Sequence, residues 1–541
     1  MTRTRIAPQK VILIVLCVLF GLFLAFPMVT ILVQSLSAGD GLTLEFYRNN
    51  FSKGIGNAFL NSVGVSALSA LLAVVLAFIP AYAANYTKLN NQFKKALSVM
   101  MMLPMLLPTI TYGFAIIYSL GKQGLITKLI GTQLIDIYGV SGLVLGYVIY
   151  TVPTAYMLIN NTMKFIDKKF MVVSRLMGDS KFKCFFSTVL TPLASTLAVA
   201  FIQSFTLSFT DYGIPAALAG NVDLLCTRLY NEMLGSLPNF HTGSAVSILM
   251  LLPSVVSIVL VTVLNKYNIR YPKITQVELE HDRFRDILFG TISLLLVGCI
   301  VAIFAVIFVM PLVDQWPYRT NFTLEHVASV FSDKALITIY KNSLLSALAT
   351  ALIGTVAVYA CALVSARHND YRKFGKIPDS ISLVTNTIPG MVLGVAYLMS
   401  FKGTFLHNSF GVLVICNIVH FFSSPYLLIK GTLEKLNASW ETTAKLMGDS
   451  WLKTVVRIIT PNAVTSLLEV FSYFFVNSMV TISAVVFLVS TKTMVITAKI
   501  KELQHFASFN EIFVLSVLIL LTNLLVKGII KISTKKLRKK G

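Results

Sequence analysis

The chain has 541 residues, of which 56% are hydrophobic and only 13% charged, and its mean hydropathy is +0.77. Soluble domains carry about 25% charged residues, so this composition excludes a water-soluble globular protein and favours a membrane protein. The formal net charge is +22. The basic residues gather at the ends of apolar segments, so they indicate topology and contacts to anionic lipid headgroups, not a nucleic-acid partner.

Apolar segments of about 20 residues with few charges predict membrane-spanning helices. Such segments recur along the whole chain, and the predicted fold class is therefore an all-α polytopic membrane protein with about twelve spans. The last part of the eleventh segment could instead be re-entrant or extracellular. The twelve segments are 11–35, 57–84, 97–120, 138–163, 189–211, 242–265, 287–313, 338–365, 379–401, 408–430, 461–490 and 511–531.

Lysine and arginine concentrate in alternate connections between these segments. The basic stretches are the N-terminus, 88–95, 164–183, 266–285, 367–376, 430–457 and 530–540. Because short cytoplasmic loops carry the excess of positive charge, we expect all of them, and both chain termini, to face the cytoplasm. The connection 491–506 goes against this rule with three lysines, which does not overturn the assignment.

The chain also contains an internal repeat. Three features recur at one offset: Asn61-Ser62 with Asn342-Ser343, Pro108 with Pro389, and Gly113 with Gly394. Six spans per half is an even number, so the two copies have the same orientation and form a parallel repeat. We expect a first half at 1–265 with an extra piece near 121–137, a cytoplasmic linker at 266–286 and a second half at 287–541.

Two charged loops, 167–187 (the first loop) and 437–457 (the second loop), share the core Arg/Lys-Leu-Met-Gly-Asp-Ser. A glycine after a helix predicts a left-handed C-cap, and the Asp-Ser pair that follows predicts the N-cap of a second helix. We therefore expect a helix, a sharp turn and a second short helix below the membrane, before the chain re-enters at Pro192 or Pro461. Basic charge beside a large apolar face suits docking into a cleft of a soluble partner. An amphipathic loop resting on headgroups is the alternative.

This loop resembles the EAA loop of bacterial ABC importer permeases. Gly178 and Gly448 match the glycine of that pattern, whereas Val172 and Thr442 stand at its glutamate position. In that family the loop forms the coupling helix that sits in a groove of the ATPase subunit. The resemblance implies that these residues couple the chain to an ATPase: Ser174, Arg175, Leu176, Met177, Gly178, Asp179, Ala444, Lys445, Leu446, Met447, Gly448 and Asp449.

The whole chain is similar to the fused two-half importer permeases of the ferric-iron and 2-aminoethylphosphonate group. The stretches 208–220 and 472–490 carry this likeness, and the second leans toward the phosphonate branch. The resemblance implies a type I importer permease fold in a bacterial inner membrane. It also implies two partners besides lipid, a cytoplasmic ATPase dimer that holds ATP and Mg and an extracytoplasmic solute-binding protein.

The sequence contains none of the motifs that would make the chain itself an enzyme. It lacks a GxxxxGK[ST] phosphate loop, an HExxH metal motif and a GxSxG nucleophile elbow. We therefore expect no catalytic residue, metal site or cofactor in this chain, and ATP hydrolysis on a separate subunit. An ion-gradient-driven secondary transporter of a small anion is the alternative function, supported by the parallel repeat and by Glu469.

Polar residues in the fifth and eleventh segments are candidates for the transport pathway. Polar and ionisable groups inside a membrane face partners or aqueous routes, although hydroxyls also hold neighbouring helices together. Glu469 could equally be a carboxylate bonded to a neighbouring helix, and Asp211 fits a helix-end residue in the outer vestibule. The pathway candidates are Ser208, Asp211, Glu469, Asn477, Ser478 and Thr481.

Overall fold

The computed structural model describes residues 8–38, 41–52, 54–267, 282–367 and 376–540. Within these ranges the only strands are two short hairpins, β1–β2 (Ser37–Ala38, Gly41–Leu42) and β3–β4 (Val313–Gln315, Arg319–Phe322). Nine described helices are long and apolar enough to cross a membrane, and up to eleven if each of two bent helix pairs counts as one span. The predicted all-α polytopic membrane fold is confirmed.

The structure replaces the straight third predicted span, 97–120, with a broken helix. Two helices, α5 (Asn91–Met102) and α6 (Thr109–Leu120), are separated by a short 3-10 turn that begins at Pro104, and Pro108 precedes α6. Proline lacks the N–H that continues a helix, so it ends the ladder at both places. The same break occurs in the second half, where α18 (Lys376–Thr387) and α19 (Gly390–Ser400) meet at 101° across Pro389.

The elements of the two halves follow one another in the same order. The first half contains α3 (Glu45–Ser52), α4 (Ile55–Tyr86), α5, α6, α7 (Leu125–Ile130), α8 (Val140–Met163), α9 (Lys169–Leu176), α10 (Lys181–Phe185), α11 (Thr191–Thr210), α12 (Gly213–Leu218), α13 (Leu225–Leu234) and α14 (Phe240–Leu264). The second half contains α16 (Glu325–Ser332), α17 (Lys334–Ala366), α18, α19, α20 (Phe410–His420), α21 (Ser423–Lys435), α22 (Ser439–Leu446), α23 (Trp451–Thr454), α24 (Thr460–Val480), α25 (Ile496–His505) and α26 (Phe509–Lys540).

The repeated Asn-Ser pair has the same structural task in both halves. The Ser62 hydroxyl accepts from the backbone N–H of Leu225 (2.9 Å), and the Ser343 hydroxyl accepts from that of Ile496 (2.8 Å). The amide of Asn61 donates to the carbonyl of Asp223, and that of Asn342 donates to the carbonyl of Met494. Each pair therefore fixes the start of α13 or α25 to the long helix of its own half, which explains its recurrence in the sequence.

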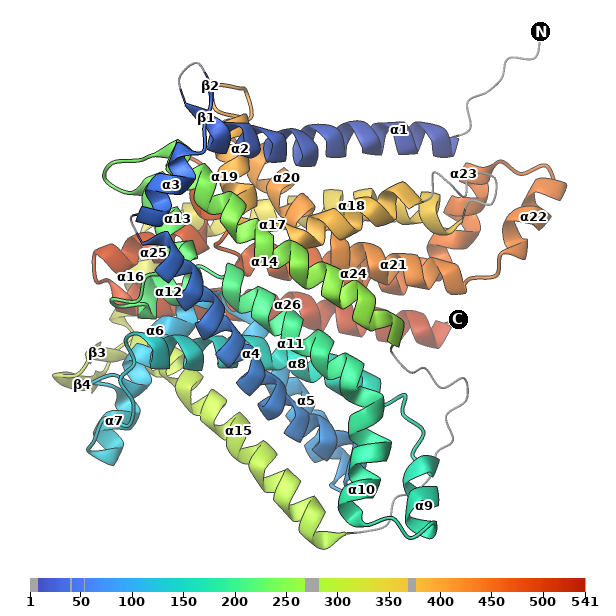
Figure 1. Ribbon diagram of the computed structural model, residues 1–541, viewed down its shortest axis with the longest axis horizontal. Helices are drawn as coiled ribbons and strands as arrows, with labels where there is room; N and C mark the ends of the chain where they lie inside the picture. Colours follow the sequence, from blue (N-terminus) through green and yellow to red (C-terminus); the bar gives the residue numbers. More distant parts are fainter. Residues whose placement is uncertain (1–7, 39–40, 53, 268–281, 368–375, 541) are drawn as a thin grey trace.

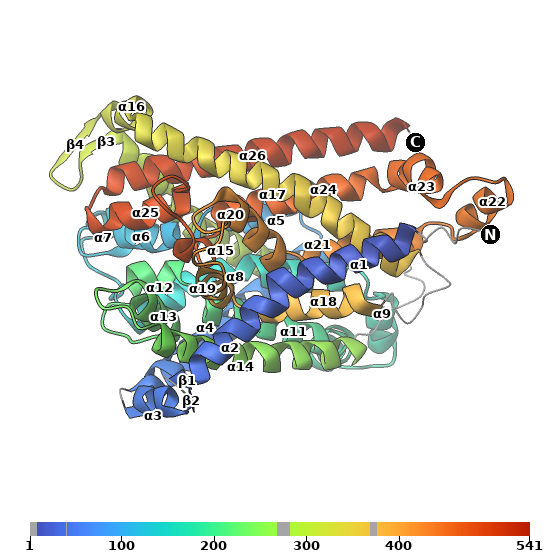
Figure 2. The same cartoon turned by 90° about the horizontal axis from the view of Figure 1, so that it is seen from above.

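The first helices of the two halves are exchanged. The N-terminal helix, α1 (Pro8–Phe20) continued by a π-helical turn into α2 (Phe26–Leu36), packs on α17 and α19 of the second half, and α2 also packs on α14 of its own half. Helix α15 (Arg283–Val309), which follows the linker, packs on α4, α5 and α6 of the first half. Figure 1 and Figure 2 show α1 beside the yellow and orange helices of the second half. One large apolar core consequently includes residues of both halves.

The long helices place the two loops at one end of the molecule. In both views the start of α1, the end of α26, α9 and the α22–α23 turn lie at the same end, here called the loop end (Figures 1 and 2). The two hairpins and helices α7, α13, α16 and α25 lie at the opposite end, here called the far end. This arrangement requires an even number of crossings between the two loops, as the parallel repeat predicts.

Candidate functional site

The tip of the first loop is a helix C-cap built on Gly178. Helix α9 ends at Leu176, and Gly178 has a φ of +84°, in the left-handed region that favours glycine. The Gly178 N–H donates to Arg175 O (3.0 Å), and the Asp179 N–H donates to Ser174 O (3.1 Å). These bonds satisfy carbonyls at the helix end. The predicted C-cap is confirmed.

The tip of the second loop repeats this geometry. Gly448 has a φ of +79° after α22, and its N–H donates to Lys445 O at 3.1 Å. The Asp449 N–H donates to Ala444 O at 2.9 Å. The two tips therefore have one backbone structure although the halves around them differ in sequence.

The residues after each glycine form the predicted N-cap. The hydroxyl of Ser180 accepts from the N–H of Lys183 at 3.3 Å, and that of Ser450 accepts from the N–H of Lys453 at 3.4 Å. The Lys183 ammonium also contacts Asp179 at 2.7 Å, and this bond is the main reason why the pKa of Asp179 is lowered. Lys453 pairs with Asp449 in the same way.

The expectation of a separate second helix in each loop is wrong. Helix α10 continues through a π-helical turn (Phe186–Leu190) into α11, and α23 continues through another (Val455–Ile459) into α24. In each case the wide turn directly precedes the segment with proline, Pro192 or Pro461. A proline ring clashes with the carbonyl four residues back in a regular α-helix, and a widened turn removes that conflict. The prolines therefore lie inside continuous spans.

Large apolar side chains project from both tips. Leu176 and Met177 are 82% and 78% exposed, and Leu446 and Met447 are 84% and 69% exposed. An exposed apolar cluster beside basic residues is typical of a surface that binds another protein. The same pair of side chains is presented twice at the loop end, as a paired partner would require.

The second loop is held to its half by a buried ion pair. Arg367 follows the last residue of α17, its side chain is 3% exposed, and its guanidinium contacts both carboxylate oxygens of Glu441 on α22 at 2.5 Å. The same guanidinium donates to backbone carbonyls at the end of α21. Bidentate arginine–carboxylate pairs are among the stronger polar contacts in proteins.

The first loop is held differently. The ammonium of Lys168 donates to the backbone carbonyl of Asn85 (2.6 Å) and lies 5.4 Å from the ring centre of Tyr86. Met171, which by the repeat corresponds to Glu441, is a buried apolar side chain. Burial lowers the pKa of Lys168, which indicates a partly desolvated ammonium.

The pathway candidates of α11 are buried within the first half. Ser208 is fully buried, and its hydroxyl has no hydrogen-bond partner among the described residues. Asp211 directly follows α11, and its carboxylate accepts from the N–H of Ile214 in the first turn of α12 at 2.9 Å. Both residues therefore lie in packed positions and do not line an open surface.

The candidates of α24 divide into two groups. Ser478 accepts from the amide of Asn417 on α20 (2.9 Å), and Thr481 ends the helix. Glu469 and Tyr473, by contrast, are exposed, and the amide of Asn477 donates to Tyr473 O at 2.8 Å on the same side of the helix. These three residues follow helical spacing and form one polar stripe, here called the α24 stripe.

The two halves meet at the far end. The amide of Gln504 on α25 donates to Ala216 O on α12 at 2.9 Å, and its oxygen accepts from the buried Lys501 ammonium at 3.0 Å. Lys501 also lies 5.8 Å from the ring centre of Tyr230 on α13, and Tyr230 contacts the ring of Phe487. The halves are thus joined at the far end, whereas α9 and α22 occupy separate corners of the loop end (Figure 1).

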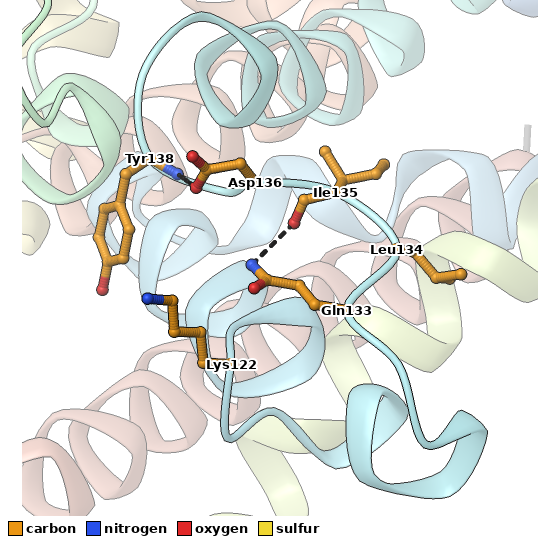
Figure 3. Close-up of a pocket in the computed structure, with 6 residues that line it drawn as sticks. All are labelled: Lys122, Gln133, Leu134, Ile135, Asp136 and Tyr138. Carbon is orange, nitrogen blue, oxygen red and sulfur yellow. Dashed lines mark hydrogen bonds between the residues drawn. The ribbon is translucent and has the colours of Figure 1, made fainter.

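A pocket of about 480 Å³ opens at the far end in the extra piece of the first half (Figure 3). Gln133 donates to Ile135 O (3.0 Å), and the N–H of Tyr138 donates to Asp136 (3.2 Å). Lys122 lines the same space. All lining residues come from the connection between α6 and α8, so the pocket belongs to that connection and not to the contact between the halves.

The duplicated arrangement is also found when the chain is compared with known protein families. Residues 73–270 and 358–539 match the family described as binding-protein-dependent transport system inner membrane component. The chain belongs to this family. The two matched regions of this permease leave out α1–α2 and the whole of α15, the helices that are exchanged between the halves.

Relatives of the permease include two ferric transport proteins. It is 24% identical to the ferric transport system permease protein FbpB of Actinobacillus pleuropneumoniae, over 90% of this chain and 72% of that protein. It is 22% identical to the putative ferric transport system permease protein FbpB 1 of Haemophilus influenzae, over 89% of this chain and 78% of that protein. The molybdenum transport system permease protein ModB of Escherichia coli is 25% identical over 30% of this chain and 72% of its own length.

Among solved structures, the permease resembles a bacterial ABC transporter involved in the import of the acidic polysaccharide alginate. The likeness covers 48% of this chain and 99% of that chain, with a TM-score of 0.37 and 17% identity.

Proposed function

We propose that this permease forms the translocation pathway of an ATP-driven importer, with the first and second loops seated on a separate cytoplasmic ATPase dimer. The observation that carries this proposal is the doubled loop tip, with the same glycine cap and the same exposed Leu-Met pair. A dimeric ATPase presents two equivalent grooves, and two equivalent tips at one end of the molecule fit them. The loop end then faces the cytoplasm, with both termini on that side.

The residues proposed to contact the ATPase are those of the two tips, Ser174 to Asp179 and Ala444 to Asp449. Closure of the ATPase dimer would draw the tips together, and the continuous helices α10–α11 and α23–α24 would carry that movement into the membrane. The contacts between Gln504, Lys501 and the first half would then open at the far end, where a solute-binding protein delivers its cargo. The permease halves are 1–265 and 287–541, and the linker 266–286 lies mostly outside the described residues.

The proposed solute is ferric iron, because two relatives that cover most of the chain are ferric transport permeases. A physical feature supports a cation: the α24 stripe contains the carboxylate of Glu469, and neither α11 nor α24 contains a lysine or arginine. A charged group on the wall of a pathway favours solutes of opposite sign. The phosphonate alternative has no counterpart among the relatives named above.

The described residues contain no group of three His, Cys, Asp or Glu side chains that could hold a metal ion. Iron would therefore cross these parts of the permease as a transient solute, and selection would rest with the binding protein.

Uptake by intact cells tests the proposal. We expect deletion of the permease to abolish uptake of radioactive ferric iron and to leave growth on 2-aminoethylphosphonate unchanged. The double variant Gly178→Pro with Gly448→Pro should no longer retain the ATPase in a pull-down. Retention of the ATPase by that variant would contradict the coupling role, and uptake by the purified chain alone in liposomes would favour the secondary transporter.

A further inference from the structure

Arg367 joins three helices of the second half through one guanidinium. Its Nε and Nη2 contact the two carboxylate oxygens of Glu441 on α22, both at 2.5 Å. Its Nη1 donates to Leu436 O (2.8 Å) and Leu433 O (3.3 Å), and Nη2 also donates to Asn437 O (2.9 Å). The carbonyls belong to the end of α21 and the turn after it, and Arg367 itself follows α17.

This arrangement needs arginine at position 367. The planar guanidinium has donors on both edges, so it can hold a carboxylate with one edge and helix carbonyls with the other. A lysine ammonium has no such fork and cannot hold both sets in this fixed geometry. The Arg367 side chain is 3% exposed and that of Glu441 is 21% exposed, so water screens the pair far less than it screens a surface salt bridge.

The first half has different residue types at the two positions that form this clamp. The repeat that aligns Asn61 with Asn342 places Tyr86 opposite Arg367, and the repeat that aligns Gly178 with Gly448 places Met171 opposite Glu441. Between α4 and the first loop the structure shows other contacts, among them the bond from Lys168 to the carbonyl of Asn85 and the packing of Phe185 on Tyr82.

We propose that Arg367 is a positioning residue, through which the second loop moves as one body with α17 and α21. The proposal rests on the proposed function. Its physical basis is that the clamp ties α22 directly to the end of α17 and to the end of α21, at the base of the second loop, whereas the tip is continuous along the chain with α24. Without the clamp, movement of the tip would still reach α17 through the packing of α21 and α24, but the fixed connection at the base of the second loop would be lost.

The test uses the permease assembled with its ATPase and binding protein in liposomes, and measures ATP hydrolysed per ferric ion transported. We expect Arg367→Met to raise this ratio about tenfold, a change typical of coupling between distant sites. Glu441→Gln keeps the side-chain volume and the bonds from Arg367 to α21, so it should raise the ratio by a smaller factor. The matched control in the first half, Lys168→Met, should change it less than either.

The variant Arg367→Lys tests whether the shape of the guanidinium matters or only its positive charge. We expect it to behave like Arg367→Met, because the fork is lost while the charge remains. Restoration of the wild-type ratio by lysine would overturn the proposed geometry. A parallel fall of hydrolysis and transport in Arg367→Met and Glu441→Gln, with the ratio unchanged, would overturn the positioning role. The ATPase should stay bound to every variant, since the tips are intact. Failure of the wild-type chain to bind it would count against the proposed function instead.

Discussion

The first and second loops match at their tips and differ where they join the helix bundle. At the tips the glycine φ angles are +84° and +79°, a serine caps the next helix, and an aspartate pairs with the lysine four residues on. At the bases, one loop is clamped by Arg367 and Glu441, and the other rests on Met171 and the bond from Lys168. A surface that must fit a repeated partner keeps its shape, whereas the internal attachment is free to diverge.

Helices α11 and α24, which continue from the two loops, also differ in the exposure of their polar side chains. On α11 the polar candidates Ser208 and Asp211 are buried in the first half. On α24 the polar side chains of Glu469 and Tyr473 are exposed. An exposed carboxylate in a membrane span is costly unless it meets water. The comparison therefore assigns the polar wall of the proposed pathway chiefly to the second half.

The largest effect is expected from the feature that the two loops share. Replacing Gly178 or Gly448 with valine forces a β-branched residue to a positive φ, which costs about 1–2 kcal/mol for the left-handed conformation. No atom lies within 4 Å of an added Cβ at either glycine, so the penalty is conformational and not steric. Each variant should weaken binding of the ATPase about tenfold, by the same factor in both loops. Binding measured with the detergent-solubilised permease checks this, and a strong effect in one loop alone would contradict equivalent tips.

Substitution of Glu469 tests whether α24 contributes more than α11 to the wall of the proposed pathway. We expect Glu469→Gln to lower ferric uptake about fivefold, since a unit charge 4 Å away contributes about 1 kcal/mol even in water. ATPase binding should not change, because Glu469 makes no hydrogen bond or ion pair with the described residues.

The matched control for Glu469→Gln is the residue at the same position of the first half. Val199 is buried, and Val199→Ala adds no polar group, so it should leave uptake unchanged. Equal losses in both variants would show that the two helices contribute alike, and unchanged uptake in Glu469→Gln would remove the argument for a cation.

Local features of the fold could be predicted from the sequence, because their causes lie within a few residues. The apolar segments predict the spans, and Gly178 with Ser180 predicts both caps of the first tip. Pro104 and Pro108 also indicate the broken third span, although hydropathy alone misses it. Composition, periodicity and capping thus account for most of the elements.

Long-range contacts could not be predicted in the same way. The exchange of α1–α2 with α15 depends on packing between residues hundreds of positions apart, for which one sequence contains no pattern. The partner of Glu441 lies 74 residues away, and the visible clue was only an acidic residue one position before the expected glutamate. The contact between Lys501 and Tyr230 has no local pattern at all.

The smallest effect is expected from the exposed pair Asp179–Lys183 of the first tip. The bond from Lys183, and a second from Ser174, lower the pKa of Asp179 below its ordinary value. A carboxylate with a lowered folded pKa stabilises the fold at pH values above its unfolded pKa, and this contribution is lost as the pH falls through the folded pKa. The tip should therefore be insensitive to pH in the neutral range and weaken only in acid, below about pH 4.

Lys183→Met removes the main cause of that pKa shift and should leave the unfolding temperature at neutral pH nearly unchanged, because exposed pairs are screened by water and salt. Lys453→Met in the second loop is the matched variant, since Asp449 and Lys453 form the same contact. Thermal unfolding of the solubilised permease at neutral and acid pH, in low and high salt, compares the two. A large loss at neutral pH in either variant would mean that the pair holds the tip together, and that the glycine cap alone does not define it.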